Sequence, residues 1–246
     1  MEEVTVLQYA AVALCALLAG TIGGVAGYGT GLLMPLVLAP IAGPEADVPI
    51  IGLSVLFTNA SCVLAFRNDV DLRRAVLIGG VAFPTCLLGA YGYTFLTGRG
   101  AALVIGTFLV LMVPARRLLK RLRTQLSEGS LAAAGAGYGL LVGGTAGSGV
   151  VLLSILMAAG LNGRAVIATD AVVSIVLGFA KTGVFQIFGA LPVSSWIMAL
   201  IVGLSATPGA FIAKRLTETL PVHIHNAILD AAIICGGVLL IAQALF

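Results

Sequence analysis

The sequence predicts an all-α polytopic membrane protein built from two inverted-topology repeats, with broken or re-entrant half-helices at two glycine-rich motifs. Three observations support this fold class. Hydrophobic residues make up 60% of the chain, charged residues only 9%, and the mean hydropathy is +1.13, whereas soluble domains contain about 25% charged residues. One glycine-rich phrase occurs twice, 120 positions apart. The basic residues gather in loops that fall on one face of the predicted bundle.

The first half of the chain contains five apolar segments, at residues 4–22, 32–42, 48–66, 75–96 and 101–113. A full span needs ~20 residues, so the second segment is too short to be one. It directly follows a cluster of glycines, each of which costs about 1 kcal/mol relative to alanine inside a helix. We therefore expect a half-helix at 32–42, which either crosses as a short leg or turns back as part of a re-entrant hairpin.

The second half repeats this arrangement, with apolar segments at residues 131–142, 150–161, 166–188, 194–213 and 224–246. The phrase from Gly23 to Gly29 recurs from Gly143 to Gly149, and the short segment 150–161 follows the second copy. Later landmarks agree, because Gly79…Pro84 matches Gly203…Pro208 at a spacing of 124. We predict a first transmembrane repeat over 1–115, a basic cytoplasmic linker over 116–129 and a second repeat over 130–246.

The placement of charge predicts the orientation. Threading the segments puts 11 of the 13 basic residues in four loops on one face: Arg67, Arg73, Arg74, Arg116, Arg117, Lys120, Arg121, Arg123, Arg164, Lys214 and Arg215. An excess of Lys and Arg marks the cytoplasmic side. The opposite face receives Arg99 with the acidic residues Glu2, Glu3, Glu45 and Asp47. Both termini then lie outside, and the first half begins outside while the second begins inside, which makes the repeats inverted.

The two glycine clusters are expected to approach each other near the middle of the membrane. Half-helices that begin near Thr30 and Val150 would point their N-termini at a shared cavity, and unpaired N–H groups with the helix dipole make such an end an anion site. The expected substrate-binding residues are Gly27, Tyr28, Gly29, Thr30, Asn59, Thr145, Gly147, Ser148, Gly149 and Lys181. The alternative is helix packing through the small-xxx-small pattern, as in Gly20-xxx-Gly24 and Gly139-xxx-Gly143. Both interpretations can hold together.

Ionisable residues within apolar segments are functional by default. Lys181 could bind the anion, or it could extend its stem toward the membrane surface. Asp170 and Asp230 are candidates to carry a coupling proton. Asp170 could instead be an acid near a helix N-terminus, and Asp230 could pair with Lys214 or Arg215. Lys181 and Asp170 share a helix face but lie 11 residues apart, roughly 16 Å by helical rise, so they should not pair.

Several classes of function find no support in the chain. No HExxH, GxSxG or Asp-rich motif is present, and no Gly-Lys-Ser/Thr follows a glycine cluster, so neither an enzyme nor a nucleotide-binding loop is expected. Cys15, Cys62, Cys86 and Cys235 lie in apolar runs without CxxC spacing and are expected to be small buried hydrophobic residues. No catalytic residue, metal site, cofactor or nucleic-acid partner is predicted.

These features resemble the sulfite exporter TauE/SafE family, also called the 4-toluene sulfonate uptake permease family. The resemblance rests on the phrase from Gly23 to Pro35 (GGVAGYGTGLLMP) and its echo from Gly143 to Leu156, and it covers essentially the whole chain. The second copy departs from the first, with Val150, Val151 and Ile155 in place of Thr30, Gly31 and Pro35. The resemblance implies a secondary carrier for sulfur-containing anions such as sulfite, sulfoacetate or other organosulfonates, in a bacterial or archaeal inner membrane.

We therefore expect a multi-pass transporter, and in particular an exporter, that holds a small anion between the glycine breaks and works by alternating access. Its partners would be the anion, membrane lipids, a possible coupling proton and a possible second copy of the chain. The alternatives are an anion channel, which would conduct far faster and show no counterflow, and a non-transporting membrane scaffold or enzyme subunit, which would show no flux.

Overall fold

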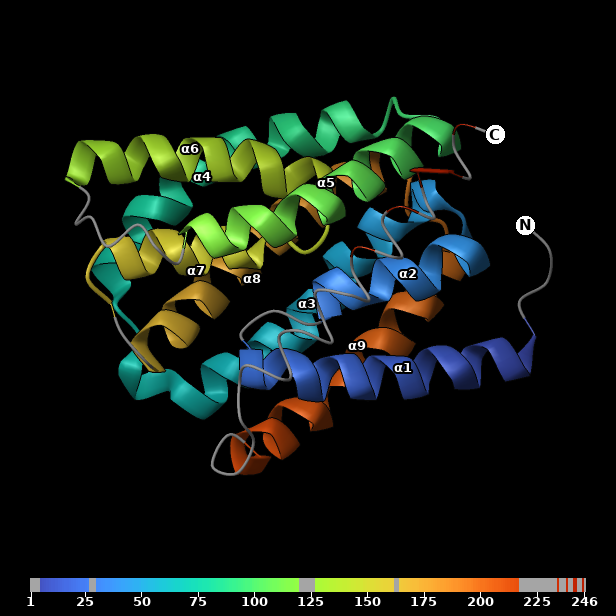
Figure 1. Ribbon diagram of the computed structural model, residues 1–246, viewed down its shortest axis with the longest axis horizontal. Helices are drawn as coiled ribbons and strands as arrows, with labels where there is room; N and C mark the ends of the chain where they lie inside the picture. Colours follow the sequence, from blue (N-terminus) through green and yellow to red (C-terminus); the bar gives the residue numbers. More distant parts are fainter. Residues whose placement is uncertain are drawn as a thin grey trace.

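A computed structural model of the protein describes residues 5–26, 30–119, 127–161 and 164–216, together with residues 234, 238, 241, 242 and 245. All secondary structure over these residues is helical (Figure 1). The prediction of an all-α protein is thus confirmed for the described residues. The elements in chain order are α1 (Val6–Ala26), α2 (Thr30–Ala42), α3 (Pro44–Phe66), η1 (Arg67–Asp69), α4 (Leu72–Tyr93), α5 (Gly98–Leu119), α6 (Glu128–Gly144), α7 (Gly149–Ala158), α8 (Arg164–Ile187) and α9 (Val193–Leu216).

Helix lengths follow the apolar segments of the sequence. Three of the described helices contain stretches long and apolar enough to cross a membrane, at Pro44–Leu64, Leu72–Tyr93 and Ala165–Ile187. The two shortest described α-helices are α2, with 13 residues, and α7, with 10. These are the two segments that the sequence marked as half-helices. The predicted last segment, 224–246, lies almost entirely outside the described residues.

Helices α3 and α8 lie at the centre of the fold and run antiparallel. A Cβ on Gly52 of α3 would lie 2.9 Å from Cε of Lys181 on α8, and one on Gly178 of α8 would lie 2.7 Å from Cδ2 of Leu56 on α3. Residue numbers therefore rise along α3 as they fall along α8. Glycine at these positions lets the two helices approach closely, as is typical of helix pairs in membranes.

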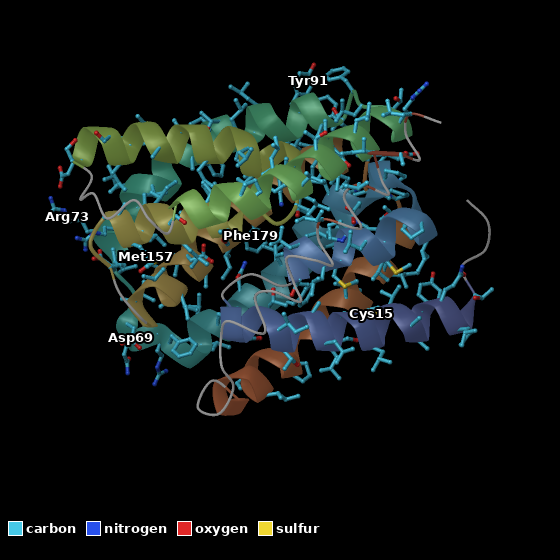
Figure 2. The ribbon with its side chains drawn as sticks, viewed as in Figure 1. Cys15, Asp69, Arg73, Tyr91, Met157 and Phe179 are labelled. Carbon is cyan, nitrogen blue, oxygen red and sulfur yellow. The ribbon has the colours of Figure 1, made fainter. Side chains whose placement is uncertain are left out.

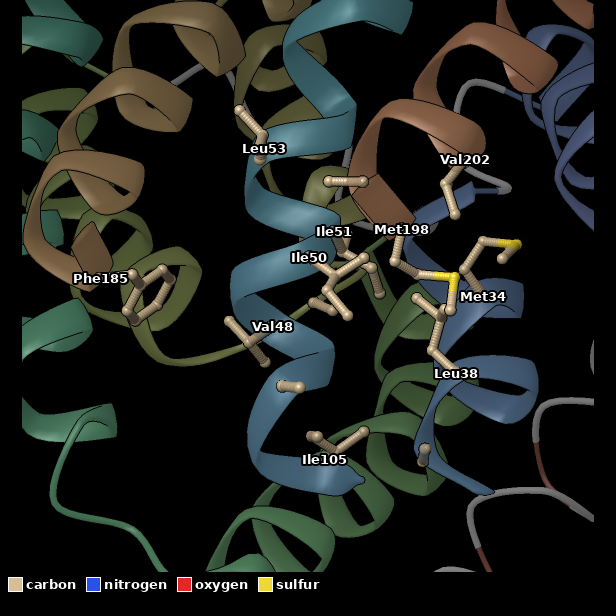
Figure 3. Packing of buried hydrophobic residues seen from close by; sticks show 14 of the residues in the cluster. Met34, Leu38, Val48, Ile50, Ile51, Leu53, Ile105, Phe185, Met198 and Val202 are labelled. Carbon is tan, nitrogen blue, oxygen red and sulfur yellow. The ribbon is translucent and has the colours of Figure 1, made fainter. Parts of the chain in front are cut away.

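Two buried clusters flank this central pair. One gathers side chains from α1, α2, α3, α5 and α9, the ends of α4 and α8 and the start of α7, with Met34, Ile50, Ile105, Phe185 and Met198 among them (Figure 3). The other gathers side chains from α4, α6, α7 and α8, including Ile78, Leu152 and Leu156. In a membrane such clusters stabilise the fold through close packing more than through removal of apolar surface from water.

The helix contacts recur between the two halves of the chain. Helix α1 packs along α9, and α6 packs along α4; α3 also contacts α9, and α8 contacts α4. The closest approaches match as well, because Gly20 lies against the backbone of Ala206 and Gly139 against that of Ala82. Ala82 and Ala206 are 124 positions apart, like the other landmarks of the second half. The packing interpretation of the GxxxG patterns therefore holds for Gly20 and for Gly139-xxx-Gly143.

Replacing Gly139 by alanine is expected to destabilise the fold by about 1–3 kcal/mol, the usual cost of overpacking. The added Cβ would lie closer than 3 Å to the backbone of Ala82, so α4 and α6 would have to separate. Gly137→Ala is the matched control on the same helix, because a Cβ there meets nothing within 4 Å. The thermal unfolding midpoint in detergent should fall for Gly139→Ala and hold or rise for Gly137→Ala; equal midpoints would contradict the close contact.

The end of the molecule near η1 carries several of the predicted loop charges. Asp69 and Arg73 lie at this end in Figure 2, and Arg73 pairs there with Glu128 at the start of α6. Asp71 caps α4 by accepting hydrogen bonds from the backbone N–H and the guanidinium of Arg74. These bonds lower the pKa of Asp71. The N–H of Asp71 donates to Oγ1 of Thr169 at 3.0 Å, which fastens the start of α4 to α8.

Candidate functional site

A cavity of about 90 Å³ lies where α2, α3, α6, the α6–α7 break and α8 meet. Its apolar wall includes Leu32 and Ile51 from one buried cluster and Leu177 from the other. The site therefore lies between the two packed clusters rather than within either. Its polar side chains come from Asn59, Tyr138, Thr145, Ser148, Ser174 and Lys181, and its glycines are Gly31, Gly147, Gly149 and Gly178.

The two glycine-rich motifs touch each other at this cavity. A Cβ on Gly31 would lie 2.9 Å from the N and Cα of Gly147, and one on Gly147 would lie 2.8 Å from the carbonyl oxygen of Gly31. Gly147 has φ +79, a left-handed conformation that favours glycine. Any side chain at either position would push the two motifs apart, so glycine is required here for close approach and, at Gly147, also for backbone geometry.

The second motif interrupts the helix. Helix α6 ends at Gly144 and α7 begins at Gly149, so residues 145–148 are non-helical. Ser148 is the N-cap of α7, but its side chain makes no capping hydrogen bond. The first N–H groups of a helix have no partner within the helix. The N-terminus of α7, with Gly147, Ser148 and Gly149 on the cavity wall, can therefore offer donors to an anion.

Lys181 lines the cavity and is 4% exposed. Its methylene stem packs against Gly52, where a Cβ would lie 2.9 Å from Cε. This placement does not fit a side chain that extends to the membrane surface, so the alternative of snorkelling is wrong. Among the described residues, no carboxylate forms an ion pair with its amine and no hydrogen bond satisfies it. Lys181 thus presents a basic group without a protein partner to a small polar cavity.

The other polar groups at the cavity differ in their ability to form hydrogen bonds with a ligand. Asn59 is half-buried and is one of the residues that line the cavity. Tyr138 is buried, and its phenol lies beside the hydroxyls of Ser148 and Ser174 and near Asp170. Thr145 lines the cavity too, but its hydroxyl donates to the carbonyl of Leu141 at 2.6 Å. Thr145 therefore has no proton left to donate to a ligand, unlike the donor expected from the sequence.

Asp170 lies just outside the cavity. It is 9% exposed, and Oδ1 has no hydrogen-bond partner among the described residues. Helix α8 begins at Arg164, so Asp170 is its seventh residue. It lies beyond the first turn of the helix, and the helix dipole acts mainly within that first turn. It is four residues before Ser174, so the two side chains share a helix face. Asp170 therefore lies nearly two turns into α8 and not at its N-terminus.

The structure places the remaining predicted residues as follows. Thr30 is buried at the start of α2 and is not part of the cavity wall. Gly27, Tyr28, Gly29 and Asp230 lie outside the described residues. Among the polar side chains of the cavity, Tyr138 and Ser174 were not predicted site residues, and among its glycines Gly31 and Gly178 were not. Ser174 was within reach of sequence reasoning, because it lies between Asp170 and Lys181 on the face they share; Tyr138 carries no such signal.

The polar groups at the cavity are of kinds that bind a ligand. No cluster of three His, Cys, Asp or Glu side chains that could hold a metal ion occurs within the described part of the chain. Cys15, Cys62 and Cys86 are free thiols. A partnerless amine, helix-terminal N–H groups, an amide and hydroxyls are groups that hold a small oxyanion.

Comparison with known proteins gives one match. The family model described as "Sulfite exporter TauE/SafE" matches residues 12–240, nearly the whole chain. No curated protein matches the chain, and no solved structure does.

Proposed function

The chain belongs to the sulfite exporter TauE/SafE family, a family of membrane transporters and not of enzymes, and on this premise we propose that it is a secondary carrier that exports small sulfur-containing anions. Sulfite, sulfoacetate and other organosulfonates are the substrates that fit the family. The observation that carries the proposal is Lys181, which is buried in the cavity where the two glycine motifs touch and has no ion-pair partner within the described part of the chain. An anion would supply the missing partner.

Three kinds of donor would hold the anion. The ammonium of Lys181 would neutralise its charge, the N–H groups at the start of α7 would bind its oxygens, and the Ser148 hydroxyl and Asn59 amide would orient it. Charge-assisted hydrogen bonds of this kind are roughly twice as strong as neutral ones. Because the groups converge from α3, α7 and α8, a movement of any of these helices would change the affinity of the site.

For the mechanism we propose alternating access by two inverted repeats. The support is the recurrence of helix contacts, with α1 on α9 matched by α6 on α4, together with the placement of the site at the contact between the two halves. One repeat would rock against the other about α3 and α8. In the proposed orientation the η1 end, with Arg67, Arg73 and Arg74, faces the cytoplasm of a bacterial or archaeal cell, and both termini lie outside.

Proton coupling is the proposed source of energy. Asp170 is the group that supports it, since it is buried, lies one turn from Ser174 on the cavity wall and has a carboxylate oxygen that accepts no hydrogen bond from the residues the structure describes. Asp230, the other candidate, lies outside the described residues. Transport by the purified protein in liposomes should respond to an imposed pH gradient; transport that ignores the gradient would contradict coupling and leave the anion site standing.

The function is tested by uptake into proteoliposomes, with sulfite, sulfoacetate, taurine and sulfate compared side by side. We expect saturable uptake of sulfite or an organosulfonate, with counterflow when unlabelled substrate is trapped inside. Conduction far above carrier rates without counterflow would show an anion channel. No flux of any of the four from protein that is correctly inserted would favour a membrane scaffold.

A further inference from the structure

Asp47 is a buried carboxylate that the anion site does not use. From its sequence position it belongs with the acidic residues of the outer face, but the structure places it in the interior: it is 0% exposed, and neither carboxylate oxygen has a hydrogen-bond partner among the described residues. Glu45, two residues earlier, is exposed. The two residues differ because they lie in the first turn of α3, where residues two apart point to different sides of the helix.

Asp47 belongs to the row of α3 residues that forms one wall of the cavity. Ile51, Val55 and Asn59 line the cavity, and Asp47 precedes Ile51 by the same interval of four residues. Residues at i and i+4 lie on the same face of a helix, one turn apart. Asp47 is therefore one turn, about 5.4 Å, beyond the cavity along its wall.

Asp170 holds the corresponding position on α8. It lies one turn before Ser174, which lines the cavity with Leu177, Gly178 and Lys181. Because α3 and α8 are antiparallel, the two acids lie at opposite ends of the cavity. Asp170 is an electrostatic neighbour of Cys62, which is 15 residues after Asp47 on α3, so the two carboxylates are separated by roughly 22 Å along the helix.

Asp47 forms no ion pair with any cation among the residues that the structure describes. The described ionisable groups toward this end of the packed elements include Tyr93 of α4, Glu45 of α3 itself, Arg99 in the first turn of α5 and Lys181 of α8. Helices α2 and α9 present none among the side chains that the structure describes, and Asp170 of α8 and Arg73 and Arg74 of α4 lie toward the other end. The Tyr93 hydroxyl donates to the carbonyl of Pro44 at 2.8 Å and is thus committed. Lys181 packs against Gly52, which is five residues after Asp47 on α3.

An ionised carboxylate without a partner is costly in an apolar interior and takes up a proton instead. We propose that Asp47 is a proton-binding site, and that it and Asp170 form the outer and inner stations of a proton path through the anion cavity. In this path a proton from the outer aqueous phase adds to a carboxylate oxygen of Asp47 and passes to the cavity as the outer half opens and closes. The hydroxyls of Tyr138 and Ser174 on the cavity wall relay it to a carboxylate oxygen of Asp170, which releases it on the inner side. The direction of the path rests on the proposed function and orientation. The binding of a proton by Asp47 rests on neither.

Infrared spectroscopy of the full chain in lipid tests the site without transport. A protonated carboxyl has a C=O stretch separate from that of a carboxylate, so the protein should show this band at neutral pH and Asp47→Asn should remove one component of it. Glu45→Gln, which changes an exposed acid two residues away, is the matched control and should leave the band unchanged. An Asp47→Asn spectrum identical to that of the unsubstituted protein across the pH range would overturn the proposal.

Proton counting tests the path. In liposomes with a trapped pH indicator, the number of protons moved per sulfite should fall at least tenfold in Asp47→Asn and in Asp170→Asn, and stay unchanged in Glu45→Gln. An unchanged proton count in Asp47→Asn would overturn the path even if the infrared band is present. Absence of transport of all four anions (sulfite, sulfoacetate, taurine and sulfate) by the correctly inserted, unsubstituted protein would instead refute the proposed function, and the infrared result would then decide the proton site by itself.

Discussion

Replacing Lys181 by methionine is expected to weaken anion binding by about 10- to 100-fold. A hydrogen bond to a charged group contributes about 1.5–3 kcal/mol, and every 1.4 kcal/mol is a factor of ten in affinity. Methionine fills a similar volume without the charge, so the cavity keeps its shape. The measurement is the concentration dependence of sulfite uptake into proteoliposomes, with the apparent affinity compared between the variant and the unsubstituted protein.

The same substitution should leave the fold intact or stabilise it. Lys181 has no ion-pair partner among the described residues, and replacing a buried unpaired charge by an apolar side chain relieves the cost of its desolvation. Loss of binding together with an equal or higher unfolding midpoint would separate a substrate-binding lysine from a structural one. A lower midpoint with unchanged uptake would show that Lys181 serves the packing of α3 on α8 instead.

Two further variants define the control. Phe179→Leu changes a side chain on α8 that is 64% exposed and lies two residues from Lys181, so uptake should be unaffected. Gly52→Ala keeps the lysine but would place a Cβ 2.9 Å from its Cε. Because that atom is near the end of a flexible side chain, the stem can shift and move the amine. We expect an affinity between those of the unsubstituted protein and Lys181→Met.

The sequence predicted the parts of the site that depend on composition and repetition. Duplicated glycine motifs followed by short apolar runs marked α2 and α7 as the shortest helices, and the glycine at Gly147 proved to be needed for contact with Gly31. Lys181 was identifiable because a lysine inside a long apolar run is rare. These features are local, and each can be recognised without knowing which helices meet.

The residues that sequence reasoning placed differently depend on depth and on tertiary contacts. Hydropathy alone began the third apolar segment at residue 48, which left Asp47 in a loop. The helix begins at Pro44, because proline is favoured at the first helical position, and its first turn carries Asp47 into the interior. Tyr138 belongs to the site because α6 packs beside α8, a contact that its own sequence neighbourhood does not encode.

Replacing Gly147 by alanine is expected to have the largest effect on the fold and on transport together. At φ +79 an alanine costs roughly 1–2 kcal/mol through backbone strain. Its Cβ would also lie 2.8 Å from the carbonyl of Gly31, which adds about 1–3 kcal/mol of overpacking. The N-terminus of α7 would then be displaced from the cavity, so uptake should fall more steeply than stability alone explains, and Gly147→Leu should abolish it.

Gly189→Ala separates the two causes. Gly189 has φ +71, and a Cβ there meets nothing within 4 Å, so alanine at this position carries the backbone strain without the contact. The difference in unfolding free energy between the two variants, about 1–3 kcal/mol, measures how tightly the two glycine motifs touch. Uptake should be retained in Gly189→Ala because that turn lies away from the cavity. Equal losses of stability and equal uptake in the two variants would mean that the motifs do not meet, and the anion site between them would have to be abandoned.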